Sequence, residues 1–365
     1  MKLESNPRVR QQRCASLALQ VALALLALCA VLTACSSSSS AQTSNKNGSS
    51  LRSTVGNWKI GTAVGVKALR SDATFRKVLA QQFNSLTAED AMKWVSVEPT
   101  RGTYDWSGAD QIVAFAKAHG QKVRGHNLVW HRQLPKWLTN GNFGAAELRT
   151  LLKRHITSEV SRYRGRIYAW DVVNEPLDDT AGLRGTMWLQ KLGKGYIADA
   201  LRWAHAADPK AKLYLNDYSI EGTGPKSDAM YDLVKSLLAK KVPINGVGFE
   251  AHLDLNYGFP SGFEDNLKRF TKLGLEVAIT ELDVRMTLPA TSDDLAQQAD
   301  YYRNVIAACR AVKGCVGATV WVFADKYSWI PRFFPGEGAA DLFDSKLKPK
   351  PAYTAVLDEL SQTSS

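Results

Sequence analysis

The chain is poor in cysteine, with five among its 365 residues. Cys14, Cys29 and Cys35 lie in the first fifty residues, which leaves Cys309 and Cys315 for the rest of the chain. No histidine or second cysteine pair lies near these two, so the pattern does not complete a zinc site, and we expect no metal. In an exported protein such a pair indicates a disulfide, here one that closes a loop between a helix and a strand.

The chain also lacks a basic run interleaved with aromatic side chains. Its formal net charge of +11 is spread along the sequence, and part of it precedes an apolar stretch from Leu17 to Leu32. We therefore expect no nucleic-acid partner. The apolar stretch is short for a membrane span, which needs about 20 residues.

Basic residues followed by this apolar stretch are typical of a secretory signal peptide. The stretch ends in Leu32-Thr33-Ala34-Cys35-Ser36, which resembles the lipobox of bacterial lipoproteins, where the cysteine is lipidated and begins the mature chain. We therefore predict a lipoprotein signal peptide over residues 1–34 and lipidation at Cys35. The alternative is an ordinary signal cleaved nearby.

The Ser-, Asn- and Gly-rich sequence that follows has too little apolar surface to fold, and predicts a flexible tether over residues 35–52. The membrane contact is then made only through the lipid on Cys35. We expect an exported protein anchored at the bacterial cell surface or outer membrane, with secretion as the alternative.

From about residue 58, apolar runs alternate with segments of helical periodicity. The runs that predict strands are Trp58–Val64, Phe83–Thr87, Lys122–His126, Ile167–Asn174, Lys212–Asn216, Gly246–Glu250, Glu276–Glu281 and Gly317–Trp321. Helical segments between them include Asp110–Ala118, Ala145–Arg162 and Asp294–Ala311. Such alternation indicates parallel pairing, and eight units predict one (β/α)8 TIM barrel, an α/β fold, over residues 53–362.

An open doubly wound sheet is the alternative architecture. That fold usually carries a Gly-rich phosphate loop after its first strand. Gly61-Thr62-Ala63-Val64-Gly65 matches neither Gly-rich fingerprint, so the barrel is favoured.

Two glutamates stand at the ends of predicted strands. Glu175 follows Ile167–Asn174, and Glu281 closes Glu276–Glu281. In a TIM barrel the carboxyl ends of the strands carry the active site. Two carboxyl groups on either side of one bond are what glycoside hydrolysis requires, at about 5–5.5 Å in retaining enzymes. The pair therefore predicts a sugar-cleaving site.

The other strand ends concentrate Trp, Tyr, His, Lys and Glu, which stack on sugar rings and hydrogen-bond to hydroxyls. The segments Phe83–Trp94, Val123–Leu138, Trp170–Pro176, Ile279–Val284, Thr319–Trp329, Asp341–Asp344 and Lys348–Tyr353 together resemble glycoside hydrolase family 10, the endo-β-1,4-xylanases. The likeness runs from about Gly61 to Tyr353, nearly the whole predicted barrel.

The resemblance implies that Glu175 is the general acid/base and Glu281 the nucleophile. It further implies that Asn174 binds the 2-hydroxyl of the attacked sugar, that His252 holds Glu281, and that Asp283 orients His252. The implied substrate-binding residues are Glu89, Lys93, His126, Trp130, Gln133, Tyr218, Trp321 and Trp329. Tyr218 lies just beyond the scissile bond, and the others lie before it.

Three residues depart from the family pattern. Glu250 stands where Gln is frequent, and we regard it as a candidate for tuning the pKa of the nucleophile. Asp90 stands where Asn is common, which affects the grip on the distal sugar. Val322 follows Trp321 where Gly is usual, so the local loop differs.

We therefore expect a monomeric, retaining endo-1,4-β-xylanase that cuts xylan internally, leaves xylo-oligosaccharides and needs no cofactor. A retaining β-1,4-glucanase on the same barrel is one alternative. A surface xylan-binding protein with impaired catalysis is another, kept open by Glu250. A barrel lyase or isomerase would need a metal cluster or a Schiff-base lysine at the strand ends, which the sequence does not clearly offer.

Overall fold

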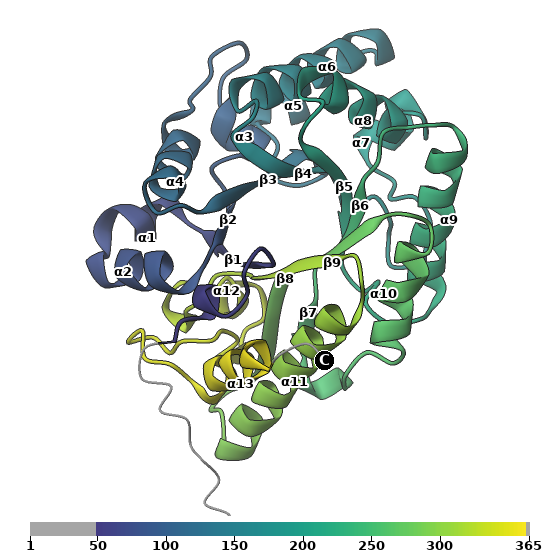
Figure 1. Ribbon diagram of the computed structural model, residues 1–365. Helices are drawn as coiled ribbons and strands as arrows, with labels where there is room; N and C mark the ends of the chain where they lie inside the picture. Colours follow the sequence, from purple (N-terminus) through teal and green to yellow (C-terminus); the bar gives the residue numbers. More distant parts are fainter. Residues whose placement is uncertain (1–48, 363–365) are drawn as a thin grey trace, which may run out of the picture. The chain divides into compact units, whose positions relative to one another are not determined.

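The computed structural model describes residues 49–362, and within them the main sheet is a closed parallel barrel. Its strands are β1 (Lys59–Val64), β2 (Ser85–Ala88), β3 (Lys122–Val129), β4 (Ile167–Asn174), β5 (Lys212–Asp217), β6 (Gly246–Phe249), β8 (Glu276–Thr287) and β9 (Cys315–Val320). Neighbours follow chain order, and β9 pairs in parallel with both β8 and β1, which closes the ring (Figure 1). The predicted TIM barrel is confirmed.

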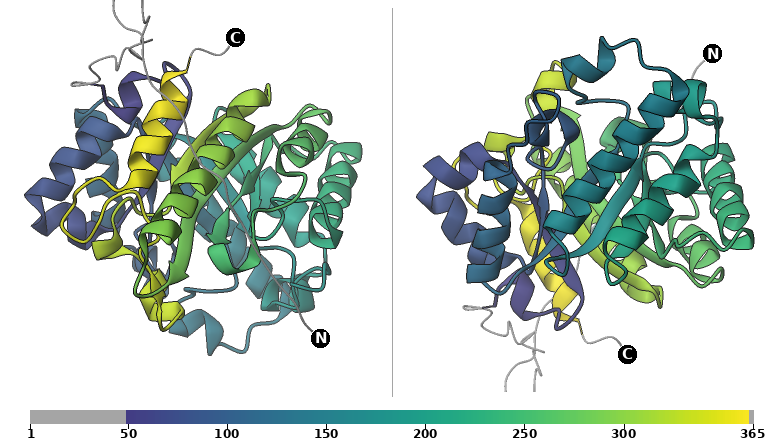
Figure 2. Two further views of the ribbon diagram at one scale, coloured as in Figure 1. Left: turned by 90° about the horizontal axis from the view of Figure 1, so that it is seen from below. Right: turned by 90° about the horizontal axis from the view of Figure 1, so that it is seen from above.

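Helices pack around the outside of the strands, as both views in Figure 2 show. They are α1 (Val66–Ser71), α2 (Ala73–Gln82), α3 (Trp94–Val97), α4 (Ser107–Ala118), α5 (Lys136–Thr139), α6 (Ala145–Arg162), α7 (Met187–Leu192), α8 (Tyr196–Ala207), α9 (Pro225–Ala239), α10 (Phe263–Thr271), α11 (Ser292–Ala311), α12 (Ile330–Phe333) and α13 (Pro351–Ser361). The described residues also contain the short 3-10 helices η1 (Leu51–Ser53), η2 (Leu255–Tyr257) and η3 (Asp325–Tyr327).

The predicted helix Ala145–Arg162 coincides with α6, whereas α4 and α11 begin earlier than predicted. The start of α11 is fixed by a capping box, in which the side chains of Thr291 and Asp294 bond to each other's backbone N–H. Because both are polar, apolar periodicity alone did not reveal this first turn.

Strand β8 continues six residues past its predicted end at Glu281. Two short strands pair with this extension: β7 (His252–Asp254) in parallel and β10 (Glu337–Gly338) antiparallel. The predicted strand Gly246–Glu250 ends instead at Phe249, and Ala251, with a φ of 60°, separates it from β7. The extension carries Asp283 and places His252 beside it.

The hydrophobic core fills the space between barrel and helices, where parallel strands are covered on both faces. It includes Leu86, Val123, Leu213, Val247 and Val277, from strands β2, β3, β5, β6 and β8. Side chains alternate along a strand, so the residues next to these face the barrel interior. Several of those interior residues are polar.

A buried ion pair occupies the barrel interior below the strand ends. Arg124 Nη2 lies 2.5 Å from Asp171 Oδ1, and the guanidinium lies 4.3 Å from the centroid of the Tyr214 ring. Burial alone would raise the pKa of Asp171, but the Arg124 charge outweighs it and lowers that pKa. Nδ1 of His126 lies 3.1 Å from the other oxygen, so the pair supports a predicted site residue from below.

Cys309, at the end of α11, and Cys315, at the start of β9, form the predicted disulfide, with Cα atoms 5.3 Å apart. Cys35, the predicted signal peptide and most of the predicted tether lie outside the described residues. Within residues 49–362, no helix combines the length and apolarity needed to cross a membrane. Leu51 is buried and Arg52 donates to the carbonyls of Ala80 and His119, so the last two residues of the predicted tether already pack against the barrel domain.

Candidate active site

The two predicted catalytic glutamates project from neighbouring regions of the barrel mouth. Glu175 directly follows β4 and adopts a φ of 51°, with its N–H bonded to the carbonyl of Asn216 at 2.8 Å. A positive φ in a non-glycine residue costs energy and is typical of functional sites. Glu281 lies within β8, and its N–H donates to the carbonyl of Glu250 at 2.9 Å. Backbone bonds to adjacent strands thus fix both side chains.

Glu281 is surrounded by donors and positive charge. Its Oε1 accepts from Asn216 Nδ2 at 2.7 Å, and its Oε2 lies 3.4 Å from His252 Nε2. Burial raises the pKa of Glu281, but attraction from His126, His252 and Lys93 outweighs that effect and lowers it. Glu281 is therefore ionised at neutral pH, as a nucleophile must be.

Glu175 has the opposite electrostatic environment. Burial raises its pKa, and the negative charge of Glu281 raises it further, against the opposing charges of Arg184 and Arg132. Nδ1 of His131 lies 3.8 Å from Glu175 Oε2, and burial, reinforced by those two arginines, lowers the pKa of His131 to about 4. A neutral imidazole therefore faces a carboxyl group whose pKa is raised above its usual value.

His252 links the nucleophile to a buried carboxylate. Its Nδ1 donates to Asp283 Oδ2 at 2.9 Å, and Trp329 Nε1 donates to the same oxygen at 2.8 Å. Burial opposes the charged imidazolium, but Asp283 and Glu281 prevail and raise the pKa of His252 to about 10. The structure thus places His252 and Asp283 in the geometry that the resemblance implied.

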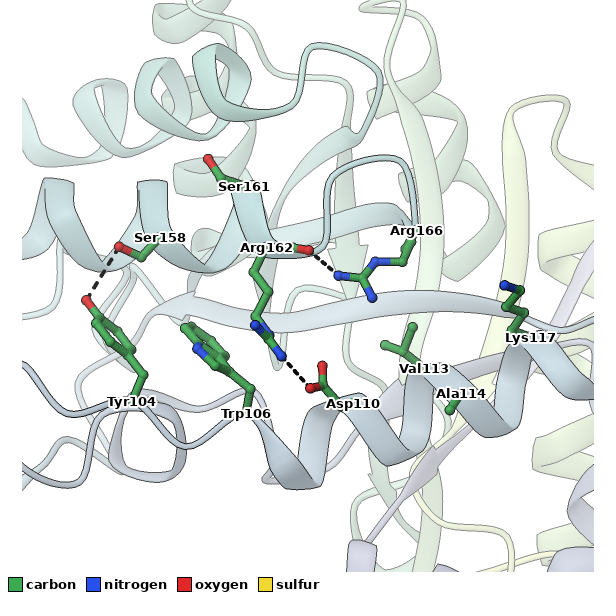
Figure 3. Close-up of a pocket in the computed structure, with 10 residues that line it drawn as sticks. All are labelled: Tyr104, Trp106, Asp110, Val113, Ala114, Lys117, Ser158, Ser161, Arg162 and Arg166. Atoms are coloured by element: carbon green, nitrogen blue, oxygen red, sulfur yellow. Dashed lines mark hydrogen bonds and ion pairs between the residues drawn. The ribbon is translucent and has the colours of Figure 1, made fainter.

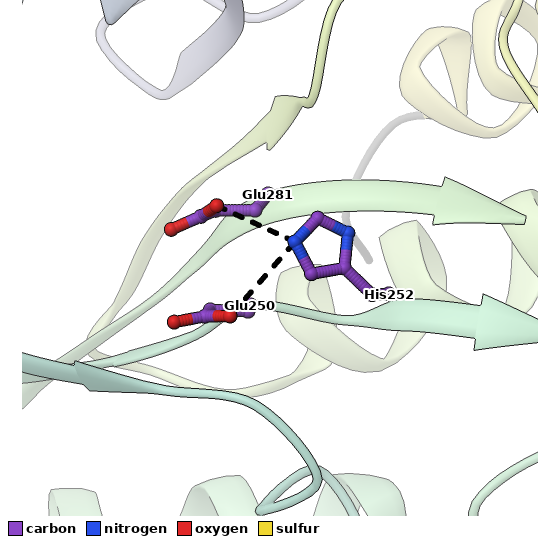
Figure 4. A group of neighbouring side chains, drawn as sticks. All are labelled: Glu250, His252 and Glu281. Atoms are coloured by element: carbon purple, nitrogen blue, oxygen red, sulfur yellow. Dashed lines mark ion pairs between the residues drawn. The ribbon is translucent and has the colours of Figure 1, made fainter. Parts of the chain in front are cut away.

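Glu250, His252 and Glu281 form a group whose ligand atoms all lie within 4.8 Å of one another (Figure 4). The set has the composition of a metal site. A metal, however, needs the lone pair of a neutral imidazole. Nε2 of His252 carries a proton at neutral pH and points to Glu281, so the group behaves as an ion-pair network.

Asn216, which follows Leu215 on β5, was not among the predicted site residues. Its Nδ2 lies 2.8 Å from Asn174 Oδ1 and 3.1 Å from Glu250 Oε1, besides its bond to Glu281. Gly248 makes room for it, because a Cβ there would lie 2.0 Å from Asn216 Oδ1. The position of Asn216 at the end of a predicted strand, two residues before Tyr218, was the available signal.

Glu250 is fully buried at the centre of this network. Burial, followed by the charges of Glu281 and Glu175, raises its pKa well above the usual value. Glu250 is therefore a neutral acid at neutral pH, with nearly the shape and hydrogen-bonding capacity of the glutamine frequent in the family.

The residues predicted to bind sugars before the scissile bond lie together on the other side of Glu281. Nζ of Lys93 lies 4.5 Å from the Trp130 ring centroid and 5.7 Å from that of Trp321. The His126 ring meets Trp321 edge-on at 5.1 Å, and His252 meets Trp329 at 5.0 Å. Trp130, Trp321 and Trp329 thus line this side of the site, and the ammonium group of Lys93 lies near the first two rings.

Glu89 and Gln133, the remaining residues of this group, are connected through Asp90. Gln133 Nε2 donates to Asp90 Oδ1 at 2.9 Å. Burial, and then the charge of Asp90, raise the pKa of Glu89 to about 7, although Lys93 opposes the rise. The grip of Glu89 on a hydroxyl group is therefore pH-dependent near neutrality.

Tyr218 lies on the Glu175 side of the mouth. Its hydroxyl accepts from Arg184 Nη2 at 2.9 Å and donates to Asp179. Nζ of Lys226 lies 3.3 Å from the ring centroid, and Arg184 Nε donates to the Glu175 carbonyl at 3.1 Å. Arg184 and Lys226 were not predicted, and together they hold Tyr218 as a fixed platform.

A hollow of about 820 Å³, away from the barrel mouth, lies on the outer surface between α4 and α6 (Figure 3). It contains none of the predicted site residues. Tyr104 and Trp106 stack on each other at 5.0 Å, and the Arg162 guanidinium lies 5.2 Å from Trp106. Because these side chains cover one another, the hollow offers little free ring surface.

Comparisons with known proteins agree with this geometry. Residues 50–359 match the sequence profile of glycosyl hydrolase family 10. An endo-1,4-β-xylanase of Agaricus bisporus is 51% identical over 280 residues, 77% of this chain and 84% of that protein. Endo-1,4-β-xylanase A of Phanerodontia chrysosporium is 45% identical over 318 residues, 87% and 78% of the two chains. Xylanase 10B of Thermotoga petrophila RKU-1, solved with xylobiose, is 40% identical, with a TM-score of 0.83 over 86% of this chain and 97% of that one.

Replacing Glu250 by glutamine removes a titrating group and keeps its shape. In the Glu250→Gln variant, we expect the acidic limb of kcat/KM on xylo-oligosaccharides to stay in place, because ionisation of Glu281 governs it. The alkaline limb, which loss of the Glu175 proton governs, should stay as well, because Glu250 is still uncharged at the pH where Glu175 ionises. A pH profile of both proteins checks this, and an alkaline limb that moves to lower pH in the variant would show that Glu250 is ionised in the wild type and raises the pKa of Glu175.

Proposed function

The chain belongs to glycosyl hydrolase family 10, and we infer from this and from its site that it is an endo-1,4-β-xylanase. It hydrolyses internal β-1,4-xylosidic bonds of xylan with retention of anomeric configuration. The observation that carries this conclusion is the pair of glutamates held at one barrel mouth. Glu281 lies between His252 and Asn216 with its pKa lowered, and Glu175 follows β4 with its pKa raised. One acid and one ionised nucleophile are the two groups that a double displacement requires.

In the first step, we assign Glu281 the attack on the anomeric carbon. As the glycosidic C–O bond breaks, Glu175 gives its proton to the departing oxygen, and a covalent xylosyl ester forms on Glu281. In the second step, Glu175 takes a proton from water, and the hydroxide attacks the anomeric carbon. The ester bond breaks, Glu281 regains its charge, and the two inversions together give retention.

The pKa of Glu175 falls between the two steps, because the charge of Glu281 is lost. While Glu281 is esterified it carries no charge, so one cause of the raised pKa of Glu175 is removed. Glu175 then loses its proton more readily and serves as a base. No other group has to move for the acid to become a base.

The neighbouring residues act as positioning groups in this scheme. Imidazolium His252 and the amide of Asn216 hold one oxygen each of Glu281. Asn174 accepts from Asn216, which leaves its amide N–H groups free to donate to the 2-hydroxyl of the attacked sugar. Such fixed donors lower the barrier without reorganisation during reaction.

Two alternatives are weaker. For a β-1,4-glucanase, Trp321 and Trp329 would crowd the position of the extra hydroxymethyl group. A surface binding protein with impaired catalysis would not need opposite pKa shifts at Glu175 and Glu281. Glu250, which kept that alternative open, is neutral and leaves the nucleophile ionised.

We also propose that the enzyme is a monomeric, exported lipoprotein, held at the bacterial cell surface or outer membrane by the lipid on Cys35. The lipobox-like sequence before Ser36 and the Ser-rich tether support this. Labelling the full chain with radioactive palmitate in a bacterial host tests it. Label and membrane association should both be lost in Cys35→Ala, and equal soluble secretion of both proteins would instead favour an ordinary signal.

Hydrolysis followed by proton NMR tests the assigned reaction. Residues 51–365 should cleave unbranched β-1,4-xylan much faster than carboxymethylcellulose, and new reducing ends should appear first as the β-anomer. In Glu281→Ala, turnover should fall by about 10⁴-fold or more with the thermal unfolding temperature nearly unchanged, because the variant lacks the nucleophile. Initial α-anomer or substantial residual activity would contradict the mechanism, and cleavage of the glucan alone would contradict the substrate.

A further inference from the structure

The end of the barrel opposite the active site is strongly basic. This end is formed by the eight segments that lead into the barrel strands, each running from the residue after a helix to the first residue of the next strand. Together these segments contain ten lysines and arginines but only two carboxylates, Asp208 and Glu276. The mouth, in contrast, carries the many carboxyl groups described above.

The two carboxylates leave most of this positive charge uncompensated. Asp208 is buried and accepts from backbone N–H groups, and Glu276 pairs with Lys212 at 3.0 Å. Lys59 and Arg166 donate to backbone carbonyls. The other seven cations are exposed, and none forms an ion pair with a carboxylate of the described residues. We call these seven the basic face: Lys122, Arg164, Lys210, Lys240, Lys241, Lys272 and Lys313.

The basic face has no apolar anchor among the described residues. The large apolar side chains that these residues expose are Val95, Tyr257, Leu288 and Phe333, and each follows the carboxyl end of a strand, on the mouth side. Contact with the basic face therefore depends on charge. A protein partner is disfavoured, because protein interfaces bury an apolar and aromatic centre. A broad anionic surface, bound without insertion of side chains, fits better.

The chain enters the barrel domain at the same end. Leu51 N–H donates to Gln82 Oε1 at the end of α2, at 3.1 Å, and Trp58 Nε1 donates to the carbonyl of Cys315 at the start of β9, at 3.0 Å. About 16 residues separate Leu51 from the predicted lipid site, and a chain of that length spans at most about 58 Å. A lipid there would keep this end of the barrel near the bilayer.

We propose that the basic face docks on an anionic phospholipid bilayer and directs the barrel mouth away from it. The inference goes beyond the proposed reaction, and it rests on the proposed lipid anchor only for the identity of the surface. Lysine and arginine are attracted by the negative potential of such a bilayer. Glu175 and Glu281 lie at the other end of the barrel, so the docked enzyme still presents its site to xylan. An acidic polysaccharide carries the same charge, but it would be bound at the end remote from the catalytic pair.

Sedimentation of residues 51–365 with lipid vesicles tests the docking. These residues carry the whole barrel and lack Cys35, so the result does not depend on lipidation, and hydrolysis of xylan shows that they are folded. The protein should sediment with vesicles of about 40% phosphatidylglycerol in phosphatidylcholine, and should remain in solution with phosphatidylcholine alone. Because the contact is electrostatic, raising the salt concentration from about 50 mM to about 500 mM should release the protein.

Reversing three charges of the basic face should weaken this binding. In the triple variant Lys122→Glu, Lys210→Glu and Lys272→Glu, the apparent affinity for the anionic vesicles should fall by about tenfold or more. None of these side chains belongs to the active site. Hydrolysis of xylo-oligosaccharides in solution should therefore stay within about twofold of wild type, which also shows that the variant is folded.

A matched control changes the net charge equally on the mouth side. The triple variant Lys136→Glu, Lys194→Glu and Lys346→Glu replaces exposed lysines of connections that follow strands. Its affinity for the anionic vesicles should stay within about threefold of wild type, since its basic face is intact. Wild type that is fully bound to vesicles should hydrolyse soluble xylo-oligosaccharides within about twofold of the free rate, because the mouth is unobstructed.

Absence of vesicle binding by wild type would overturn the proposal, and so would an equal loss in both triple variants, which would show an effect of net charge alone. Retention on polygalacturonate without binding to vesicles would assign the basic face to an acidic polysaccharide instead of a bilayer. Loss of hydrolysis in vesicle-bound wild type would contradict the orientation. Failure of the free wild type to cleave xylan would overturn the proposed function, whatever the vesicles show, so the two failures are distinguishable.

Discussion

The structure depends on one electrostatic constraint, which is that several carboxyl groups share a buried space too small for all of them to be ionised. The charge of Glu281 raises the pKa of both Glu175 and Glu250, Glu175 raises that of Glu250 further, and burial raises the pKa of all three. What distinguishes them is the distribution of positive charge and N–H donors. These converge on Glu281, so its pKa is lowered, whereas the pKa of Glu175 is raised and that of Glu250 is raised well above the usual value.

The barrel interior maintains this distribution. Asp283 keeps His252 protonated and aimed at Glu281, and the Arg124–Asp171 pair supports His126 from below. These partners are buried and come from different strands, so they shift little when substrate enters. Preorganisation of this kind is how a site stabilises charge that develops in a transition state. The acid and the nucleophile therefore differ because of their supporting layer, since both are glutamates at strand ends.

Much of this could be predicted from the sequence. Apolar runs located the eight strands. Because the carboxyl ends of all strands in a TIM barrel lie at one mouth, Glu175 and Glu281 were predicted to lie there together. Asn216, Arg184 and Lys226 were not predicted, because their roles arise from contacts between different elements, up to 65 positions apart along the chain. Residue type and spacing do not reveal such contacts. Strand β7 has three residues, too few to show the alternation of apolar and polar side chains typical of a strand. The raised pKa of Glu250 depends on its burial, which exists only in the folded barrel.

The central claim is the division of charge among the glutamates, and carbon-13 NMR of side-chain-labelled glutamate measures it directly. The carboxyl resonances would be followed with pH in residues 51–365, and assigned with Glu175→Gln, Glu250→Gln and Glu281→Gln. The account predicts that Glu281 ionises below the usual value, Glu175 above it, and Glu250 well above it. A titration in which Glu281 ionises after Glu175, or Glu250 ionises in the ordinary range, would contradict it.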